Sequence, residues 1–170
     1  MGRSLLVAGI DPAAVRPSTL CLFGSLNLTL KGDLETLLRV AVGMGASVIA
    51  IDSPLQLPNG PMRDVDRKAR KLGLKVLPPG WRGMRKLVER VLEALDETKV
   101  RVIETFPRGV GNYLNWIREM DNDEIDACLC AIAAWAYLRR NHFEVKAEDG
   151  VIVVTEEVLK KSVPPRKLSL

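Results

Sequence analysis

Short, almost continuously apolar runs alternate along this chain with stretches in which apolar residues recur every three or four positions. Strands are predicted over residues 4–10, 19–23, 26–30, 48–51 and 100–105, followed by a terminal hairpin over 145–154 that turns at Asp149-Gly150. The continuous apolar character of the fourth run is typical of a strand buried on both faces of a sheet. Gly24-Ser25 joins the second and third runs and signals a hairpin turn.

The helical spacing completes an alternating order of elements. Helices are predicted over residues 33–43, 62–72, 81–97 and from Asp121 or Asn122 to about Arg140. An antiparallel start is thus followed by right-handed parallel crossovers. This is the element order of the ribonuclease H-like fold. We predict one α/β domain over residues 1–157, with a mixed five-stranded sheet, helices on both faces, and a mobile basic tail at 158–170.

Acidic residues stand where this topology would bring them together. The candidates are Asp11 after the first strand, Asp52 after the fourth, Glu104 in the next one, and Asp123 and Asp126 at the start of the most apolar helix. In open α/β sheets, ligands bind beyond the carboxyl ends of the strands. Carboxylates that converge there repel one another and attract a divalent cation. We therefore expect a site for Mg²⁺ or Mn²⁺.

Each acid also has a purely structural alternative. Asp11 and Asp52 stand at or near prolines that open turns, and Asp123 could simply complement the helix dipole. Glu104 interrupts a buried strand, so it could pair with an arginine or support a ligand rather than bind metal itself. Asp126 begins an apolar helix face, where an unpaired carboxylate is costly.

The charge is unevenly distributed. The whole chain carries a net +4, yet residues 63–90 alone carry +7, so the rest sums to −3. Within that segment the candidate substrate-binding residues are Arg63, Asp66, Arg67 and Arg70, which helical spacing places on one face. They form either a clamp for phosphate groups or an internal ladder of salt bridges around Asp66. A basic segment near an acidic cluster suits a nucleic acid held by cations and cut at metals.

Other features narrow the class of protein. Three cysteines, an odd number, give no disulfide framework, and we expect a reduced, cytoplasmic protein with no membrane span. The single glutamine is typical of a thermophilic source. One histidine (His142) in polar surroundings argues against a histidine triad or zinc centre, and the chain lacks a P-loop motif. Tyr113, Trp81 and Trp116 could stack on bases or pack into the core.

Several motifs together resemble one known family, the domain of unknown function 429 family. They are Gly9-Ile10-Asp11-Pro12-Ala13, Ala50-Ile51-Asp52-Ser53-Pro54-Leu55, Arg63-x-x-Asp66-Arg67-x-x-Arg70, Leu72-Gly73, Pro78-Pro79, Met84, Val102-Ile103-Glu104-Thr105-Phe106-Pro107 and Asp123-Glu124-Ile125-Asp126-Ala127. The resemblance runs from about residue 5 to 154 and implies a predicted nuclease of ribonuclease H-like fold. Val65 departs from the cysteine expected before the Asp-Arg pair. The acids are also similar in pattern to those of Holliday-junction resolvases, to which Glu104 is an addition.

These observations predict a metal-dependent nuclease acting on DNA or RNA. In a two-metal scheme Asp11 would bridge both ions, and Asp52 and Asp126 would each complete the coordination sphere of one ion. Asp123 or Glu104 would supply a further ligand or orient a water molecule. Two alternatives stay open. One is a nucleotide- or nucleic-acid-binding protein of this fold without nuclease activity, and the other a phosphotransferase of the actin and sugar-kinase branch. A homodimer is also left open.

Overall fold

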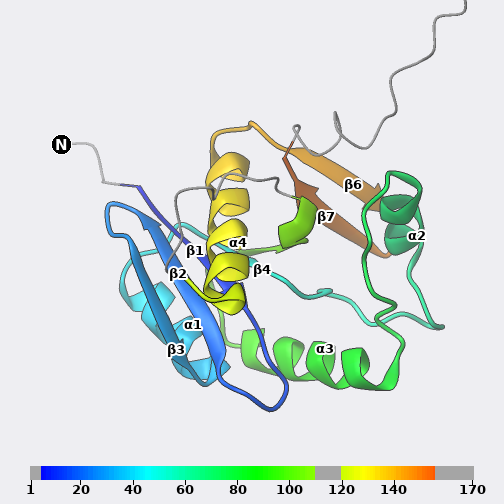
Figure 1. Ribbon diagram of the computed structural model, residues 1–170, viewed down its shortest axis with the longest axis horizontal. Coiled ribbons are helices and arrows are strands. Elements are labelled where there is room, and N and C mark those ends of the chain that lie inside the picture. The colour runs from blue at the N-terminus through cyan, green and yellow to red at the C-terminus, as the bar shows by residue number, and fades with distance from the viewer. Residues whose placement is uncertain (1–4, 110–119, 156–170) are drawn as a thin grey trace, which may run out of the picture.

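The computed structural model describes residues 5–109 and 120–155, which form a mixed sheet of seven strands with helices on both faces (Figure 1). The strands are β1 (Leu6–Asp11), β2 (Ser18–Gly24), β3 (Leu28–Gly32), β4 (Val48–Ile51), β5 (Arg101–Thr105), β6 (Phe143–Ala147) and β7 (Gly150–Val154). Their order across the sheet is β3-β2-β1-β4-β5-β7-β6. The predicted α/β class with a mixed sheet is confirmed.

The number of strands was predicted wrongly. β1, β2 and β3 are antiparallel neighbours, and β1, β4 and β5 are parallel, as the order of elements required. The terminal hairpin does not stand apart, because β7 pairs in parallel with β5 and extends the sheet from five strands to seven. The register between Glu104 and Ile152 fixes this addition, which covers the edge that β5 would otherwise expose.

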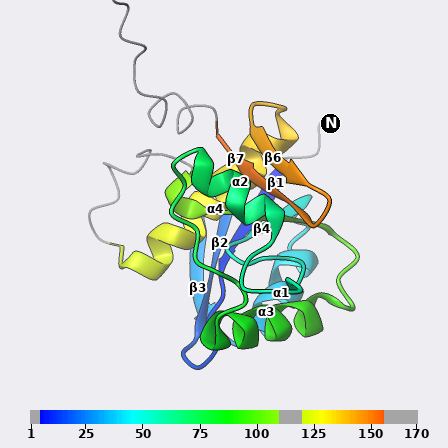
Figure 2. The same cartoon turned by 90° about the vertical axis from the view of Figure 1, so that its right-hand side faces the viewer.

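Five helices accompany the sheet. They are α1 (Leu34–Gly43), α2 (Asp64–Lys71), α3 (Arg82–Leu95), the short 3₁₀ turn η1 (Pro107–Gly109) and α4 (Asn122–Leu138). α4 covers one face of the sheet, and α1 and α3 cover the other (Figures 1 and 2). Among the helices of the described ranges, none has both the length and the apolar character needed to cross a membrane.

Alternation along β1 assigns its side chains to the two layers. Leu6, Ala8 and Ile10 are buried against α1 and α3, whereas Val7 is buried against α4. Gly9 lies on the α4 side. A Cβ built there would come within 2.1 Å of the Ala127 carbonyl oxygen and of the Ala131 nitrogen. Only glycine at position 9 therefore lets α4 approach β1 so closely, and this approach brings the start of α4 to the end of β1.

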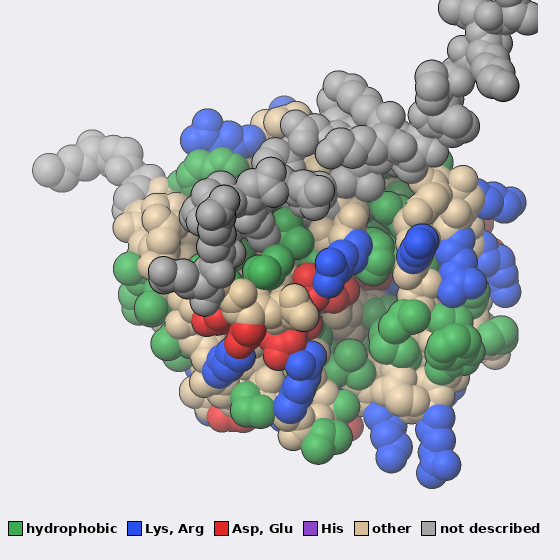
Figure 3. Space-filling model, in the orientation of Figure 1, with side chains coloured by type: hydrophobic (Ala, Val, Ile, Leu, Met, Phe, Trp, Pro, Cys, Tyr) green, Lys and Arg blue, Asp and Glu red, His purple; other side chains and the backbone are tan. Residues whose placement is uncertain are grey.

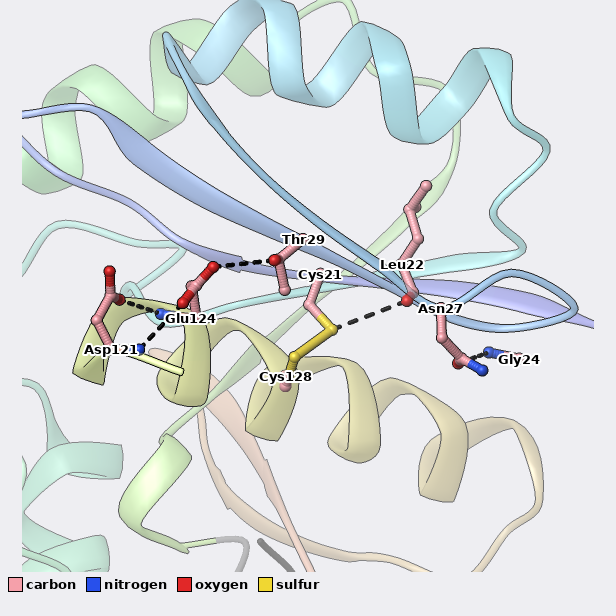
Figure 4. The surroundings of a disulfide bond; sticks show 8 residues. All are labelled: Cys21, Leu22, Gly24, Asn27, Thr29, Asp121, Glu124 and Cys128. Atoms are coloured by element: carbon pink, nitrogen blue, oxygen red, sulfur yellow. Dashed lines mark hydrogen bonds between the residues drawn. A yellow bond between two sulfur atoms is a disulfide. The ribbon is translucent and has the colours of Figure 1, made fainter. Parts of the chain in front are cut away.

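The amino-terminal half of α4 is fastened to the neighbouring strands. Cys128 on α4 forms a disulfide with Cys21 on β2, so the prediction that the cysteines have no disulfide is wrong (Figure 4). Cys130 is free and buried. In the same region the Thr29 hydroxyl donates a 3.0 Å hydrogen bond to Glu124 Oε1. Sequence could not reveal the disulfide, because its partners are 107 residues apart and meet only through the packing of α4 on β2.

The terminal hairpin is attached to α2. Asp149, in the turn between β6 and β7, accepts hydrogen bonds from the Asp64 and Val65 nitrogens at 2.5 and 3.0 Å, which caps the first turn of α2. Apolar residues of α2 and the hairpin share a separate cluster that includes Val65 and Val145. Because α2 begins at Asp64 rather than at residue 62, Arg63 precedes the helix and turns its side chain inward.

Candidate functional site

Two aspartates lie at the carboxyl ends of neighbouring parallel strands. Asp11 is the last residue of β1, and Asp52 directly follows β4. The pairing of Ile10 with Ile51, together with a 3.0 Å hydrogen bond from the Asp52 nitrogen to the Ile10 carbonyl, sets the two acids side by side on one edge. Both continue the series of residues on the α4 side of their strands, so each points toward the layer from which Asp126 comes.

A cleft of about 320 Å³ opens at this edge. Its acidic side is lined by Asp11, Asp52 and Asp126, and Glu104 and Asp66 lie deeper in its wall. Figure 3 shows acidic side chains gathered in one patch near the middle of the face, with Lys and Arg side chains beside them. The structure thus brings three of the predicted ligands to one cleft, contributed by β1, the end of β4 and α4.

The three carboxyl groups are difficult to ionise. Burial raises the pKa of Asp52 from 3.8 to about 8, with further contributions from the charges of Asp11, Asp126 and Glu104. Burial and the charges of Asp123 and Asp126 raise the pKa of Asp11 to about 6. The pKa of Asp126 is also raised, again chiefly by burial. The charge of Asp126 contributes to the raised pKa values of both Asp11 and Asp52, because the three groups lie at the same edge.

Within residues 5–109 and 120–155, the cations next to the three acids are both exposed. Arg16 holds Asp123 through two hydrogen bonds of 2.8 and 2.7 Å and stands 3.9 Å from Asp11. Arg108 Nε is 3.8 Å from Asp126 Oδ1, and that buried oxygen accepts no hydrogen bond from any described residue. Neither arginine is more than half buried, because their side chains are 61% and 68% exposed. Asp123 therefore sits at the rim, ion-paired, rather than in the lining of the cleft.

Glu104 belongs to a different environment. In the pairing of β4 with β5 it stands opposite Ile51, whose side chain is buried on the α1 and α3 side. A one-residue offset along a strand turns the side chain to the other face, so Glu104 points away from the face that carries Asp11 and Asp52. Burial raises the pKa of Glu104, and Arg63 opposes that shift. Of the alternatives that the sequence left open for Glu104, the structure shows the pairing with an arginine.

Arg63 links Glu104 to Asp66 in a buried network. Its Nη1 and Nη2 donate to the two Glu104 oxygens at 2.8 and 2.5 Å, and its Nε and Nη2 donate to the two Asp66 oxygens at 3.0 and 2.7 Å. The Arg63 side chain is 0% exposed. Burial lowers the pKa of Arg63, but the hydrogen bonds to Glu104 and Asp66 more than reverse this, so the guanidinium stays charged.

The predicted single basic face is therefore wrong. Arg63 and Asp66 are buried in their own network, whereas Arg67 and Arg70 are exposed. Arg67 pairs with Asp64 at 2.7 Å, and Arg70 donates to the Val76 carbonyl. For Arg63 and Asp66 the internal salt bridge is the observed arrangement. The reason is the start of α2 at Asp64, which places Arg63 outside the helical repeat on which the prediction relied.

The residues of the cleft suit a hard divalent cation in their chemistry. All three donors are carboxylates. A cation would reduce their repulsion and would give a partner to Asp126 Oδ1, which accepts no hydrogen bond from the described residues. Within residues 5–109 and 120–155, however, no three Asp, Glu, His or Cys side chains are arranged as a ready metal-ligand set. Binding would require Asp11, Asp52 and Asp126 to draw together by side-chain rotation.

Sequence reasoning missed three parts of this site. Arg16 and Arg108 come from loops, and no motif marks them as partners of Asp123 and Asp126. The apolar wall of the cleft combines residues of α3 and of the stretch before it with Pro54 and Phe106. Of the three aromatic candidates, Trp81 is 58% exposed and so is not a core residue, while Tyr113 and Trp116 lie outside the described residues.

Comparisons with models of known families, with curated proteins and with solved structures found no match. The resemblance described from the motifs therefore stays a prediction, and the function must be argued from the site.

Proposed function

We propose that this protein is a metal-dependent phosphodiesterase that acts on nucleic acid. The observation that carries the proposal is the group of three acids Asp11, Asp52 and Asp126, which meet in one cleft with raised pKa values and for which the described residues include no buried cationic partner. A folded chain that stabilised itself alone would pair such groups, as it does at Arg63. Groups kept at this cost are frequent at functional sites.

The finer fold assignment supports the same function. The part of the sheet ordered β3-β2-β1-β4-β5, with three antiparallel strands followed by parallel ones, agrees with a ribonuclease H-like core. In this interpretation the β6–β7 hairpin is an addition beyond β5. The acids on β1, after β4 and on α4 then occupy the positions at which the sequence motifs suggested metal ligands.

Each group of residues around the cleft would have its own role in the reaction. Asp11, Asp52 and Asp126 would hold Mg²⁺ or Mn²⁺, which when bound supplies an activated water and stabilises the leaving oxygen. Arg16 and Arg108 stand at the rim with exposed guanidinium groups and can contact phosphate oxygens. Asp123 orients Arg16 through its two hydrogen bonds rather than binding a metal directly. Glu104, Asp66 and Arg63 form the rigid floor beneath.

The basic character of the neighbouring surface favours a nucleic acid over a smaller phosphodiester. Arg82 and Lys86 on α3 are exposed, and among the described residues neither has an acidic partner. They continue the segment of net charge +7 that begins at Arg63. Helical spacing sets both residues on the side of α3 opposite Met84, so they would attract a polyanion from a distance rather than line the cleft.

The test combines metal binding with cleavage. Calorimetric titration with Mn²⁺ at pH 8, where more of the acids are ionised, should show binding that Asp11→Asn reduces at least tenfold, since one carboxylate of three is lost. Labelled single-stranded and duplex DNA and RNA should be cut with Mn²⁺ or Mg²⁺ and not by Asp11→Asn. Asp96→Asn, an exposed acid at the end of α3, is the matched control.

Absence of Mn²⁺ binding at pH 8 would overturn the proposal. Binding of metal and nucleic acid without any cleavage would instead support the non-catalytic alternative.

A further inference from the structure

The cleft has two chemically different sides. Across from the acids its wall is apolar, formed by Pro54, Val76, Leu77, Met84, Leu87 and Phe106. On the face shown in Figure 3, hydrophobic side chains gather across from the acidic patch, with Lys and Arg side chains near them. Phosphate groups have no use for such a wall. A ligand that fills the whole cleft must therefore carry an apolar or aromatic part next to its charged part.

The apolar wall is exposed where core packing would have buried it. Val88 and Val91 on α3 are fully buried, whereas Met84 and Leu87, on the side of the same helix that faces the cleft, are only partly buried. Leu77 is 56% exposed. Trp81 is the residue directly before α3, three positions ahead of Met84, and it is 58% exposed.

We propose that this wall is a subsite for an unpaired nucleobase, and that the protein engages its substrate as a single strand. The proposal rests on the nuclease function inferred above and specifies its substrate. A volume of about 320 Å³ is near the lower end for ligand pockets and suits about one nucleotide. A base held against Leu77 and Met84 would leave its phosphate toward Asp11 and Arg16.

A duplex does not fit this arrangement. Its bases are stacked and paired, so one would have to be extruded before it could contact the wall, at an energetic cost that a single strand does not bear. The next nucleotide of a single strand could reach Trp81, on which a base can stack, while Arg16 at the rim can pair with a phosphate. Grooves that combine aromatic side chains with cations are typical of single-strand binding.

The experiment measures the binding of a fluorescein-labelled ten-nucleotide oligothymidylate and of a ten-base-pair duplex by fluorescence anisotropy. Ca²⁺ is present as a hard cation that neutralises the acids. The single strand should bind at least tenfold more tightly. Trp81→Ala should weaken it by about 5- to 150-fold, as removal of a stacking platform typically does. Leu77→Ala and Met84→Ala should each weaken it about threefold or more.

Matched controls are Leu28→Ala and Met44→Ala, whose side chains are 44% and 51% exposed but do not line the cleft. They should leave the affinity unchanged. Leu77 is exposed enough that its truncation should not affect folding, which a thermal melt of each variant checks. Equal affinity for single strand and duplex, or equal effects of the Leu77 and Leu28 variants, would overturn the subsite.

The outcome is separable from that of the nuclease proposal. Cleavage that depends on metal and Asp11 but is indifferent to Leu77, Met84 and Trp81 would refute the subsite alone. Selective single-strand binding that these variants abolish, without cleavage under any metal, would keep the subsite and refute the nuclease.

Discussion

Two groups of carboxylates lie in or behind the same cleft, and the protein treats them in opposite ways. Glu104 and Asp66 are almost completely buried, yet four hydrogen bonds from the Arg63 guanidinium satisfy them. Burial also raises the pKa values of Asp11 and Asp52, yet described residues offer these two acids only the exposed Arg16 and Arg108. Burial alone thus does not decide whether an acid is paired with a cation.

The two groups of acids differ in whether a buried cation lies beside them. A buried carboxylate without a partner costs several kcal/mol, whereas a paired one is held in a fixed geometry. The fold supplies Arg63 beside Glu104 and Asp66, and no described residue is an equivalent buried cation beside Asp52. The unpaired group is where a ligand of positive charge can be accepted, and the paired group holds the neighbouring strands and α2 rigid.

The pH dependence of stability should show the largest contrast. In the folded protein Asp52 keeps its proton up to about pH 8, whereas the unfolded chain releases it near pH 3.8. Between these pH values the folded state binds more protons than the unfolded state. The free energy of unfolding is therefore highest at low pH and falls as the pH rises. The largest loss in the free energy of unfolding that this difference in pKa allows is ~6 kcal/mol, and structural relaxation around Asp52 would make it smaller.

Urea unfolding in EDTA at pH 5 to 9 measures this slope. Asp52→Asn should remove most of it and be more stable than the native protein at pH 9, while Asp96→Asn should retain it. Saturating Mn²⁺ should flatten the slope as well, and at a hundred times its Kd should add about 2.7 kcal/mol. A native slope equal to that of Asp52→Asn would mean that Asp52 is solvated and ordinary.

Removal of the internal cation should have the next largest effect. Arg63→Met leaves Glu104 and Asp66 buried without a partner, and the expected loss is about 3–5 kcal/mol in the free energy of unfolding at pH 7. Arg67→Met is the control, because Arg67 is 52% exposed and pairs with Asp64 at the surface. It should change stability by less than about 1 kcal/mol. Equal losses in the two variants would show that the network contributes nothing special.

The sequence predicted the framework of the molecule well for a physical reason. The apolar runs identified β1, β4 and β5, and Asp11 and Asp52 could be placed at one edge because parallel strands end together. The hairpin at residues 145–154 was also predicted, but nothing in its own pattern says which strand it will pair with. Its position beside β5 is a property of the assembled sheet.

The sequence allowed the acids of the candidate site to be predicted, but not the residues with which they pair. Asp11 and Asp52 follow directly from strand order, whereas the orientation of Glu104 depends on a one-residue offset in register that the sequence does not display. Likewise Arg63 and Arg67 look alike in a helical repeat, and only the exact start of α2 decides which is buried. Arg16 meets Asp123 across 107 residues, beyond the reach of any local pattern.

The smallest expected effect concerns Arg16, the cation that stands at the rim of the unpaired group. Its side chain is 61% exposed, so Arg16→Gln should change the free energy of unfolding by less than about 1 kcal/mol. Its charge lowers the pKa of Asp11 and would also repel a metal ion bound there. At pH 8, where Asp11 is ionised in either protein, only the second effect remains, and Mn²⁺ should bind the variant more tightly by a factor below about ten. Calorimetry at pH 8 in low salt measures this, with Arg85→Gln as control, because Arg85 is 50% exposed and pairs with Glu89 away from the cleft. Weaker Mn²⁺ binding by Arg16→Gln than by Arg85→Gln would mean that Arg16 organises the acids through Asp123, and the unpaired group would then resemble the Arg63 network more closely than its electrostatics indicate.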